Sequence, residues 1–248
     1  MNAFSRLLLS VAMAGGAVAG LSAQAHATLQ FSIGNGEASL TCADNTPCDS
    51  DPATGVISIP SISSPAFGVS ASGINLTSTG GTGAPTALDA VVGSFSNASG
   101  QTLSGAFALG DTSFNSVKQF RVSVSATWTN ATADSELDVT WFADALNDQG
   151  ANNPFDAPGS EFANIELDSP ETGNGTVNFS DTVSVDLSGP FSLTLQGDLT
   201  LANGGTVSVT ESVAAVPEAS TWTMLIAGFA GLGIAGYRVS RKRVALAV

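Results

Sequence analysis

The stretch that decides the fold is TVNFSDTVSVDLSGPFSLTLQGDLTLANGGTVSVTESV, from Thr176 to Val213. Apolar and polar residues alternate along it with a period of two, which is typical of strands that bury one face. The turns Ser188-Gly189-Pro190 and Asn203-Gly204-Gly205 divide it into three strands. Asn-Gly favours a tight hairpin, so we expect the last two strands to pair. Asp181 is the one charged residue on the apolar side of the first strand.

The middle of the chain repeats this pattern. Residues 121–128 alternate toward Trp128, Thr129 to Asp134 form a turn, and residues 137–141 alternate back to Trp141. We therefore predict a hairpin that buries both tryptophans. Shorter strand candidates, separated by glycine, serine and proline, are Phe31–Ile33, Ser39–Cys42, Val56–Ile59, Phe67–Ala71, Ile74–Thr77 and Leu103–Leu109. The expected fold class is all-β, with an antiparallel β-sandwich over residues 28–215.

The polar faces of these strands carry serine, threonine and asparagine in place of lysine and glutamate. Such faces are neutral and lack the lysines that usually protect edge strands from pairing. They suit a secreted protein with no special surface role. They also suit an adhesive surface that packs against polysaccharide or other copies of the chain. An ice-binding face would need Thr-x-Thr repeats on adjacent strands, which the sequence lacks.

The composition excludes several classes of function. Only Glu218 of the 21 acidic residues lies outside residues 28–216, and only Lys118 and Arg121 of the seven basic residues lie inside that range. Residues 28–216, which we call the body, are therefore strongly acidic and repel nucleic acid. The only histidine is His26 and the only tyrosine is Tyr237, so triad catalysis and histidine-based zinc sites are excluded from the body. We therefore expect that the protein is not an enzyme. The remaining enzymatic alternative is a glycoside hydrolase that uses carboxylates alone.

The two cysteines of the chain, Cys42 and Cys48, are close in sequence. In an exported protein such a pair predicts a disulfide. The loop it closes is short, so loop entropy gives it only about 2 kcal/mol of stabilisation. A two-cysteine metal site is the alternative.

The densest acidic segment is DALNDQGANNPFDAPGSE, from Asp144 to Glu161. Its carboxylates offer the hard oxygen ligands that calcium prefers, and the candidate ligands are Asp144, Asp148 and Asp156. An ordinary solvated loop is the other interpretation, because the spacing does not fit an EF-hand. A second acidic group, Asp44, Asp49 and Asp51, surrounds the cysteines. We expect no cofactor, with calcium as the alternative.

The first 27 residues have the form of a secretory signal peptide. Arg6 supplies the positive charge, Leu7 to Leu21 is apolar, and Ala25-His26-Ala27 is a small-x-small cleavage site. We predict export by the Sec machinery and cleavage by signal peptidase after Ala27. Ala23-Gln24-Ala25 is the alternative site, and an uncleaved anchor is the alternative outcome.

The C-terminal residues combine a short polar motif, an apolar run and a basic cluster. The motif contains Pro217, Glu218, Ala219 and Trp222, and the cluster is Arg238, Arg241, Lys242 and Arg243. Residues 222–237 are just long enough to cross a hydrocarbon core of about 30 Å. Trp222 and Tyr237 bracket this run, and the cations after it predict a cytoplasmic end. We expect one transmembrane helix here; a buried helix of a soluble domain is the alternative.

This combination resembles the PEP-CTERM sorting segment of Gram-negative bacteria, in its PEPxxW variant, over residues 216–243. The same kind of tail has been labelled the C-terminal domain of ice-binding proteins. The resemblance implies that an exosortase, a membrane enzyme, processes the protein near Pro217. Ala219 stands where the family usually has proline, and residues 244–248 follow as a short tail.

The sequence therefore predicts an exported protein with a transient inner-membrane anchor and a final place at the cell surface or outside it. The resemblance implies a structural or adhesive role linked to exopolysaccharide or biofilm. A calcium-dependent carbohydrate-binding module is the alternative.

The sorting hypothesis predicts a difference between two hosts, one with an exosortase and one without it. The mature protein should lose residues 222–248 only where the enzyme is present, because the Pro217-Glu218 region is read there. Mass spectrometry of the fractionated protein measures this. Retention of the tail in both hosts would identify a simple tail anchor.

Overall fold

The computed structural model describes residues 28–63, 69–81 and 86–216, together with Thr223, Ile226, Ala227, Phe229, Ala230 and Leu232. Strands account for most of the described chain. They are β1 (Gln30–Gly34), β2 (Ser39–Ala43), β3 (Val56–Ser63), β4 (Val69–Ser78), β5 (Ala87–Asn97), β6 (Leu103–Phe114), β7 (Val117–Thr129), β8 (Glu136–Asp144), β9 (Ser160–Asp168), β10 (Gly175–Leu187), β11 (Phe191–Leu201) and β12 (Thr206–Ala215).

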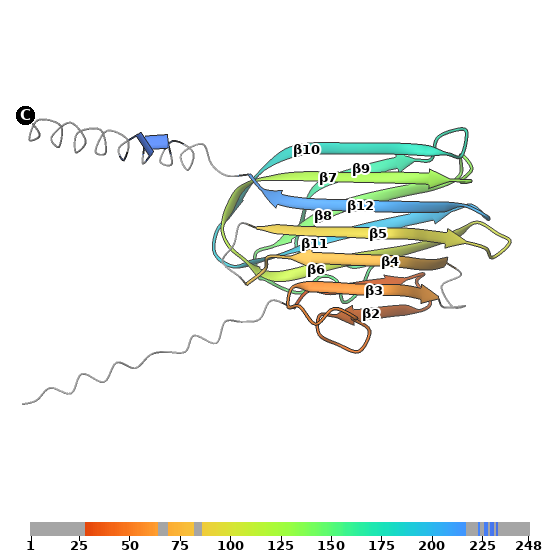
Figure 1. Cartoon of the computed structure of the whole chain (residues 1–248), viewed down its shortest axis with the longest axis horizontal. Helices are drawn as coiled ribbons and strands as arrows, with labels where there is room; N and C mark the ends of the chain where they lie inside the picture. The colour runs from red at the N-terminus through yellow and green to blue at the C-terminus, as the bar shows by residue number, and fades with distance from the viewer. Residues whose placement is uncertain are drawn as a thin grey trace, which may run out of the picture.

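The strands form two six-stranded sheets (Figure 1). Sheet A has the order β2-β1-β6-β11-β8-β9, and sheet B has the order β10-β7-β12-β5-β4-β3. Every pairing is antiparallel. The predicted antiparallel β-sandwich is therefore confirmed.

The core lies between the inner faces of the two sheets. Trp128 and Trp141, from sheet B and sheet A respectively, are almost fully buried there, as the sequence predicts. Aromatic pairs join the sheets: the ring centroids of Phe95 and Phe107 lie 5.0 Å apart, and those of Phe120 and Phe162 lie 5.2 Å apart. Rings at these distances attract each other beyond the area that they bury.

Both predicted hairpins are wrong. β11 belongs to sheet A and β12 to sheet B, and β7 and β8 are likewise in different sheets. Gly204 does adopt the positive φ, 81°, that the turn requires. The turn, however, carries the chain from one sheet to the other. An alternating strand buries the same face whether its successor pairs beside it or packs opposite it, so alternation does not decide between the two arrangements.

The strands β5 and β9 are not among those predicted from sequence. β5 contains alanine and glycine at several positions, which weakens its strand pattern. β9 is an edge strand on which Leu167 is the one fully buried side chain, so its sequence SEFANIELD is mostly polar. The sequence of either segment alone does not predict a strand, because the pairing with neighbouring strands decides the structure there.

The predicted transmembrane helix, residues 222–237, falls mostly outside the described residues. Those that are described, such as Ile226 and Phe229, are helical and exposed. No helix within the described residues is long and apolar enough to cross a membrane. The transmembrane span therefore stays a prediction.

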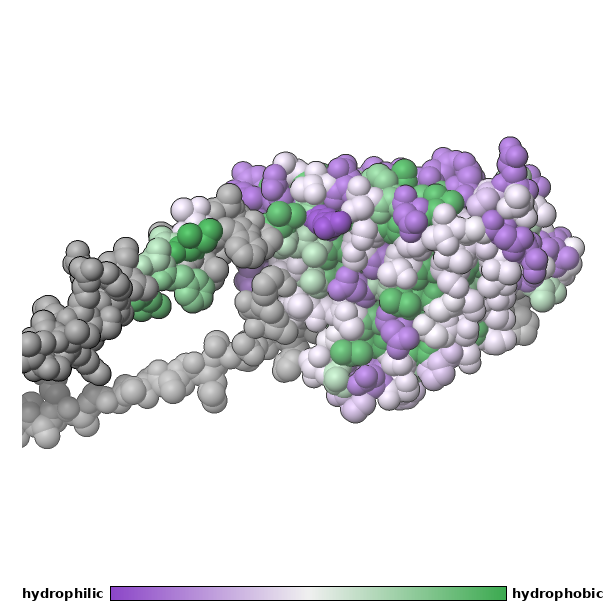
Figure 2. All heavy atoms as spheres, turned by 45° about the horizontal axis from the view of Figure 1, so that its top comes forward, coloured by the Kyte–Doolittle hydropathy of each residue, from purple (hydrophilic) through white to green (hydrophobic). Residues whose placement is uncertain are grey.

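The outer face of sheet B carries cross-strand rows of hydroxyl groups. Ser123 and Ser212 are hydrogen bonded at 2.7 Å, and Thr127 and Thr176 at 3.0 Å. Figure 2 brings the β10 side of the molecule forward and shows a mostly pale surface with scattered hydrophilic and hydrophobic residues. The neutral, hydroxyl-rich face expected from the sequence is thus present on this sheet.

Glu211 is a buried acid within the core. It lies on β12 between Ala90 and Val124 of the neighbouring strands, and its side chain is 1% exposed. Neither carboxylate oxygen has a hydrogen-bond partner among the described residues. Burial raises the pKa of Glu211 to about 8, because the low-dielectric core disfavours the charged form. The folded protein therefore holds Glu211 protonated at neutral pH.

Glu211→Gln should flatten the pH dependence of stability. The folded state keeps a proton that the unfolded state loses as pH rises from about 4.5 to about 8. The contribution of protonated Glu211 to the free energy of unfolding is therefore fully present below this pH window. Across the window the free energy of unfolding falls by up to about 1.4 kcal/mol per pH unit. The amide of the variant does not titrate, so the unfolding free energy from urea titrations should fall less steeply between pH 5 and pH 8. Exposed Glu171→Gln serves as the control, and an unchanged slope in the Glu211 variant would refute this assignment.

Asp181 places a charge on the inward side of an edge strand. β10 pairs with β7 alone, and Asp181 is opposite Val122, which is buried. Val177, Phe179, Val183 and Val185 on the same side are only partly buried. An inward charge on an edge strand discourages pairing with another chain, so Asp181 protects an otherwise continuous apolar row.

Asp181→Val should increase self-association, because it completes the apolar row on an open strand edge. We expect a concentration-dependent rise in mass by analytical ultracentrifugation, relative to the wild-type protein. Thr182→Val, on the outward side of the same strand, adds similar apolar area and should leave the mass unchanged. Equal behaviour of the two variants would show that Asp181 has no protective role.

Candidate functional site

A groove of about 230 Å³ lies on the outer face of sheet A, and we call it the sheet A groove. β6, β8 and β11 form its floor, while Asn35 and Phe155 come from the segments after β1 and β8. Its volume is slightly below the roughly 300 Å³ at which sites for drug-sized ligands begin. The side chains that give it its chemistry are Ser104, Glu136, Asp138, Phe155, Asp198 and Thr200.

Strand register sets the carboxylates side by side. Asp138 of β8 is directly opposite Asp198 of β11 and Glu166 of β9. Two residues along β8, in the neighbouring row of outward-facing side chains, Glu136 is opposite Thr200 and Asp168. Side chains directly opposite in an antiparallel pair have Cβ atoms about 5 Å apart. The outer face of β11, β8 and β9 is therefore a two-row array of acids.

Phe155 forms the aromatic part of the groove. Its side chain is 44% exposed although it is large and apolar. The Asn153 Oδ1 atom accepts a hydrogen bond of 3.2 Å from the Phe155 backbone. The ring also lies against Gly34, where an added Cβ would be 3.2 Å from the Phe155 Cε2 atom. Gly34 therefore leaves room for the ring beside the groove.

Neutral donors and hydroxyl groups hold the polar side chains in place. The Asn164 Nδ2 atom donates to Asp138 at 2.7 Å and to the Thr140 hydroxyl at 2.8 Å. The Gln196 Nε2 atom donates to Asp198 at 3.2 Å. The hydroxyls of Ser104 and Thr200 are hydrogen bonded at 3.1 Å. These bonds orient the acids without neutralising them.

The local field favours protonation of two of the acids. Partial burial, followed by the charge of Asp138, raises the pKa of Asp198 against the opposing effect of Gln196. Desolvation and the charges of Glu166, Asp168 and Asp138 raise the pKa of Glu136. Like charges in one array raise each other's pKa because each disfavours ionisation of the next.

The acids that the structure brings together are different from the predicted calcium ligands. Glu136, Glu166 and Asp168 form the one group of three among the described residues whose ligand oxygens lie within 4.8 Å of one another. Asp144, Asp148 and Asp156 do not form such a group. Asp144 is buried and accepts hydrogen bonds from the backbone of Leu146 at 3.1 Å and of Asp148 at 3.0 Å. Its carboxylate shapes the loop that follows β8.

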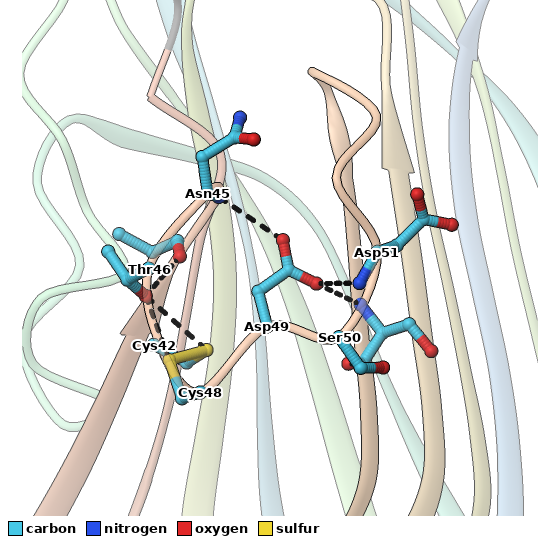
Figure 3. The surroundings of a disulfide bond; sticks show 9 residues. Cys42, Asn45, Thr46, Cys48, Asp49, Ser50 and Asp51 are labelled. Carbon is cyan, nitrogen blue, oxygen red and sulfur yellow. Dashed lines mark hydrogen bonds between the residues drawn. A yellow bond between two sulfur atoms is a disulfide. The ribbon is translucent and has the colours of Figure 1, made fainter.

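The disulfide Cys42–Cys48 is present, with its Cα atoms 5.8 Å apart, which confirms the predicted pair and removes the two-cysteine metal site. The acids around it support the loop (Figure 3). Asp49 accepts hydrogen bonds from the backbone of Asp51 and Ser58 at 2.9 Å and of Asn45 at 3.2 Å. Asp44 accepts one from Gly55 at 2.7 Å. Both of these carboxylates are thus bound to the protein's own amides.

The predicted processing sites lie outside the described residues. These are Ala25 and Ala27, the motif residues Pro217, Glu218, Ala219 and Trp222, and the basic residues Arg238, Arg241, Lys242 and Arg243. They stay predictions.

Sequence reasoning missed the groove because its residues come from distant parts of the chain. β8 and β11 are separated by two strands in sequence, yet register sets Asp138 opposite Asp198. The sequence does contain one signal of the array. Each of β8 and β9 carries two acids at alternate positions, Glu136 and Asp138 on β8 and Glu166 and Asp168 on β9. That spacing places each pair on one face.

No protein-family model matches the sequence, and no curated protein matches it. Three solved structures show a distant likeness. One, in complex with β-1,4-galactotriose, is TmCBM61 (11% identity, TM-score 0.29, 66% of this chain and 83% of that chain). Another is the K1 cleaved adhesin domain of Lys-gingipain from Porphyromonas gingivalis (9%, 0.32, 64% and 90%). The third is a carbohydrate-binding module from Cellvibrio mixtus lichenase 5A (14%, 0.26, 59% and 90%). Similarity this low identifies neither a family nor a shared site.

Proposed function

We propose that this protein is an exported, non-catalytic carbohydrate-binding module and that the sheet A groove is its binding site. The observation that carries the proposal is an exposed aromatic ring, Phe155, beside a rigid row of hydrogen-bonding side chains. A sugar ring has an apolar face of C–H groups and a rim of hydroxyls. Sites for such ligands combine an apolar surface with a few fixed polar groups.

The polar groups suit a sugar's hydroxyls. The carboxyl oxygens of Asp138 accept hydrogen bonds, and charge-assisted bonds to carboxylates are stronger than neutral ones. Ser104 and Thr200 both donate and accept. Because these groups stand on three hydrogen-bonded strands, little ordering is needed when a ligand binds.

The predicted export and sorting place such a module outside the inner membrane. We propose that the tail holds the protein until an exosortase processes it, and that the released module then binds exopolysaccharide. This role is adhesive: the protein attaches to the matrix and does not cleave it.

Phe155→Ala should weaken carbohydrate binding by about tenfold, because the loss of one ring contact is on the order of 1–1.5 kcal/mol. Full-length protein is tested by calorimetry and affinity electrophoresis against neutral, acidic and amino polysaccharides. Leu146→Ala is the matched control, because Leu146 is exposed, lies in the same segment and does not line the groove.

Phe155→Trp should retain binding, because the larger ring offers at least as much apolar surface. Failure of every polysaccharide to bind, or equal affinity of the Phe155→Ala variant and the wild type, would refute the proposal. Release of reducing ends from any of these polymers would identify a hydrolase instead.

A further inference from the structure

The charges on the strands of sheet A are all negative. β6, β8, β9 and β11 carry aspartate and glutamate but no lysine or arginine, and β1 and β2 carry no charge. The two cations of the described chain, Lys118 and Arg121, are both on β7 of sheet B. Lys118 forms an ion pair with Asp186 of β10, and the Arg121 Nε atom donates to the Ser180 hydroxyl at 3.4 Å.

This charge distribution opposes folding. Like charges directly opposite each other in a sheet are destabilising, and Asp138 has an acid opposite it on both sides. The donors that reach Asp138 and Asp198 are the neutral amides of Asn164 and Gln196. An arginine at either amide position would relieve the repulsion. The groove instead keeps its negative charge next to the aromatic ring.

We infer that the sheet A groove selects a cationic sugar polymer, one whose hexosamine units carry free ammonium groups. The inference rests on the proposed function and names the ligand class of the same groove. Charge complementarity carries it: the groove offers Glu136, Asp138 and Asp198, and a ligand that supplies positive charge removes their mutual repulsion.

The arrangement matches the two parts of such a ligand. A primary ammonium has three N–H donors and can donate to Asp138 and Asp198 together, because these carboxylates are directly opposite each other. The sugar ring that carries the ammonium then lies against Phe155. Neutral sugars obtain only the ring contact and weaker hydrogen bonds.

A divalent cation bridging an acidic polymer would be a different solution. The three acids whose oxygens converge, Glu136, Glu166 and Asp168, are all exposed. Of these three, Glu136 alone lines the groove. An ion held there would be centred toward β9 and away from Phe155. The positions of the acids therefore favour direct binding of ammonium groups.

The test compares fully deacetylated and fully N-acetylated glucosamine oligomers of equal length, in calorimetry at about 0.15 M salt with full-length protein. We expect the deacetylated oligomer to bind at least tenfold more tightly. Its affinity should fall as salt is raised, because ion pairs are screened, and should be unchanged by EDTA. The double variant Asp138→Asn, Asp198→Asn should reduce the preference to less than threefold.

Two controls separate selective binding from general attraction to an acidic protein. Asp89→Asn removes an exposed acid from sheet B and should keep the preference. Spermidine carries positive charge without a sugar ring; it should bind more weakly than the oligomer and be insensitive to Phe155→Ala. The Asn double variant should be at least as heat-stable as the wild type, because it removes repulsion.

The outcomes are distinct. Equal binding of both oligomers, with both weakened by Phe155→Ala, would overturn the amino-sugar inference and leave the carbohydrate module intact. Spermidine binding as tightly as the oligomer would also overturn it. Calcium-dependent binding of a uronic acid polymer, abolished by EDTA, would replace it with ion bridging. Absence of binding to every sugar would overturn the proposed function itself.

Discussion

Burial of the two inner sheet faces against each other is the interaction on which the rest of the structure depends. Trp141 of sheet A lies 6.4 Å from Phe179 of sheet B, measured between ring centroids, and Phe120 of sheet B packs against Phe162 and Phe191 of sheet A. A fully buried large ring such as Trp141 or Phe120 removes about 150–250 Å² of apolar surface from water, on the order of 5 kcal/mol of hydrophobic stabilisation by area. Backbone pairing orders each sheet, but these contacts hold the two sheets together. The outward-facing side chains take no part in these contacts, so their chemistry can vary without loss of the core.

The outward-facing side chains of the two sheets differ in their chemistry. Sheet B carries hydroxyls that satisfy one another across strands, such as Ser72 and Ser94 at 2.9 Å. Sheet A carries acids that lie opposite one another on neighbouring strands and repel one another. The first arrangement is stable without a partner, whereas the second gains stability when positive charge arrives. The proposed binding face is therefore the face with the less favourable electrostatics, which the shared core can support.

The sequence contains the strands of this fold but not their partners. Alternation correctly predicts β10, β11 and β12 and the burial of both tryptophans, because it reports which face meets the core. It fails for the connections: Asn203-Gly204-Gly205 is a turn, but nothing local shows that the turn changes sheets.

The groove is invisible in the sequence for the same reason, since its acids meet only through the pairing of β8, β9 and β11. The sequence favours a calcium site in the acidic segment after β8 because the acids there are close in sequence. In the structure Asp144 of that segment caps backbone amides, and the segment contributes its phenylalanine to the groove.

The position of β12 has a consequence for the order of assembly. β12 is the last strand of the sandwich, and it lies between β7 and β5 in the middle of sheet B. Until residues 206–215 join, β10 and β7 form one ribbon and β5, β4 and β3 another, and neither has a complete inner face. Pairings so distant in sequence form slowly, since loops must close before the contacts form. Sheet B therefore cannot be completed until the final strand of the sandwich is available.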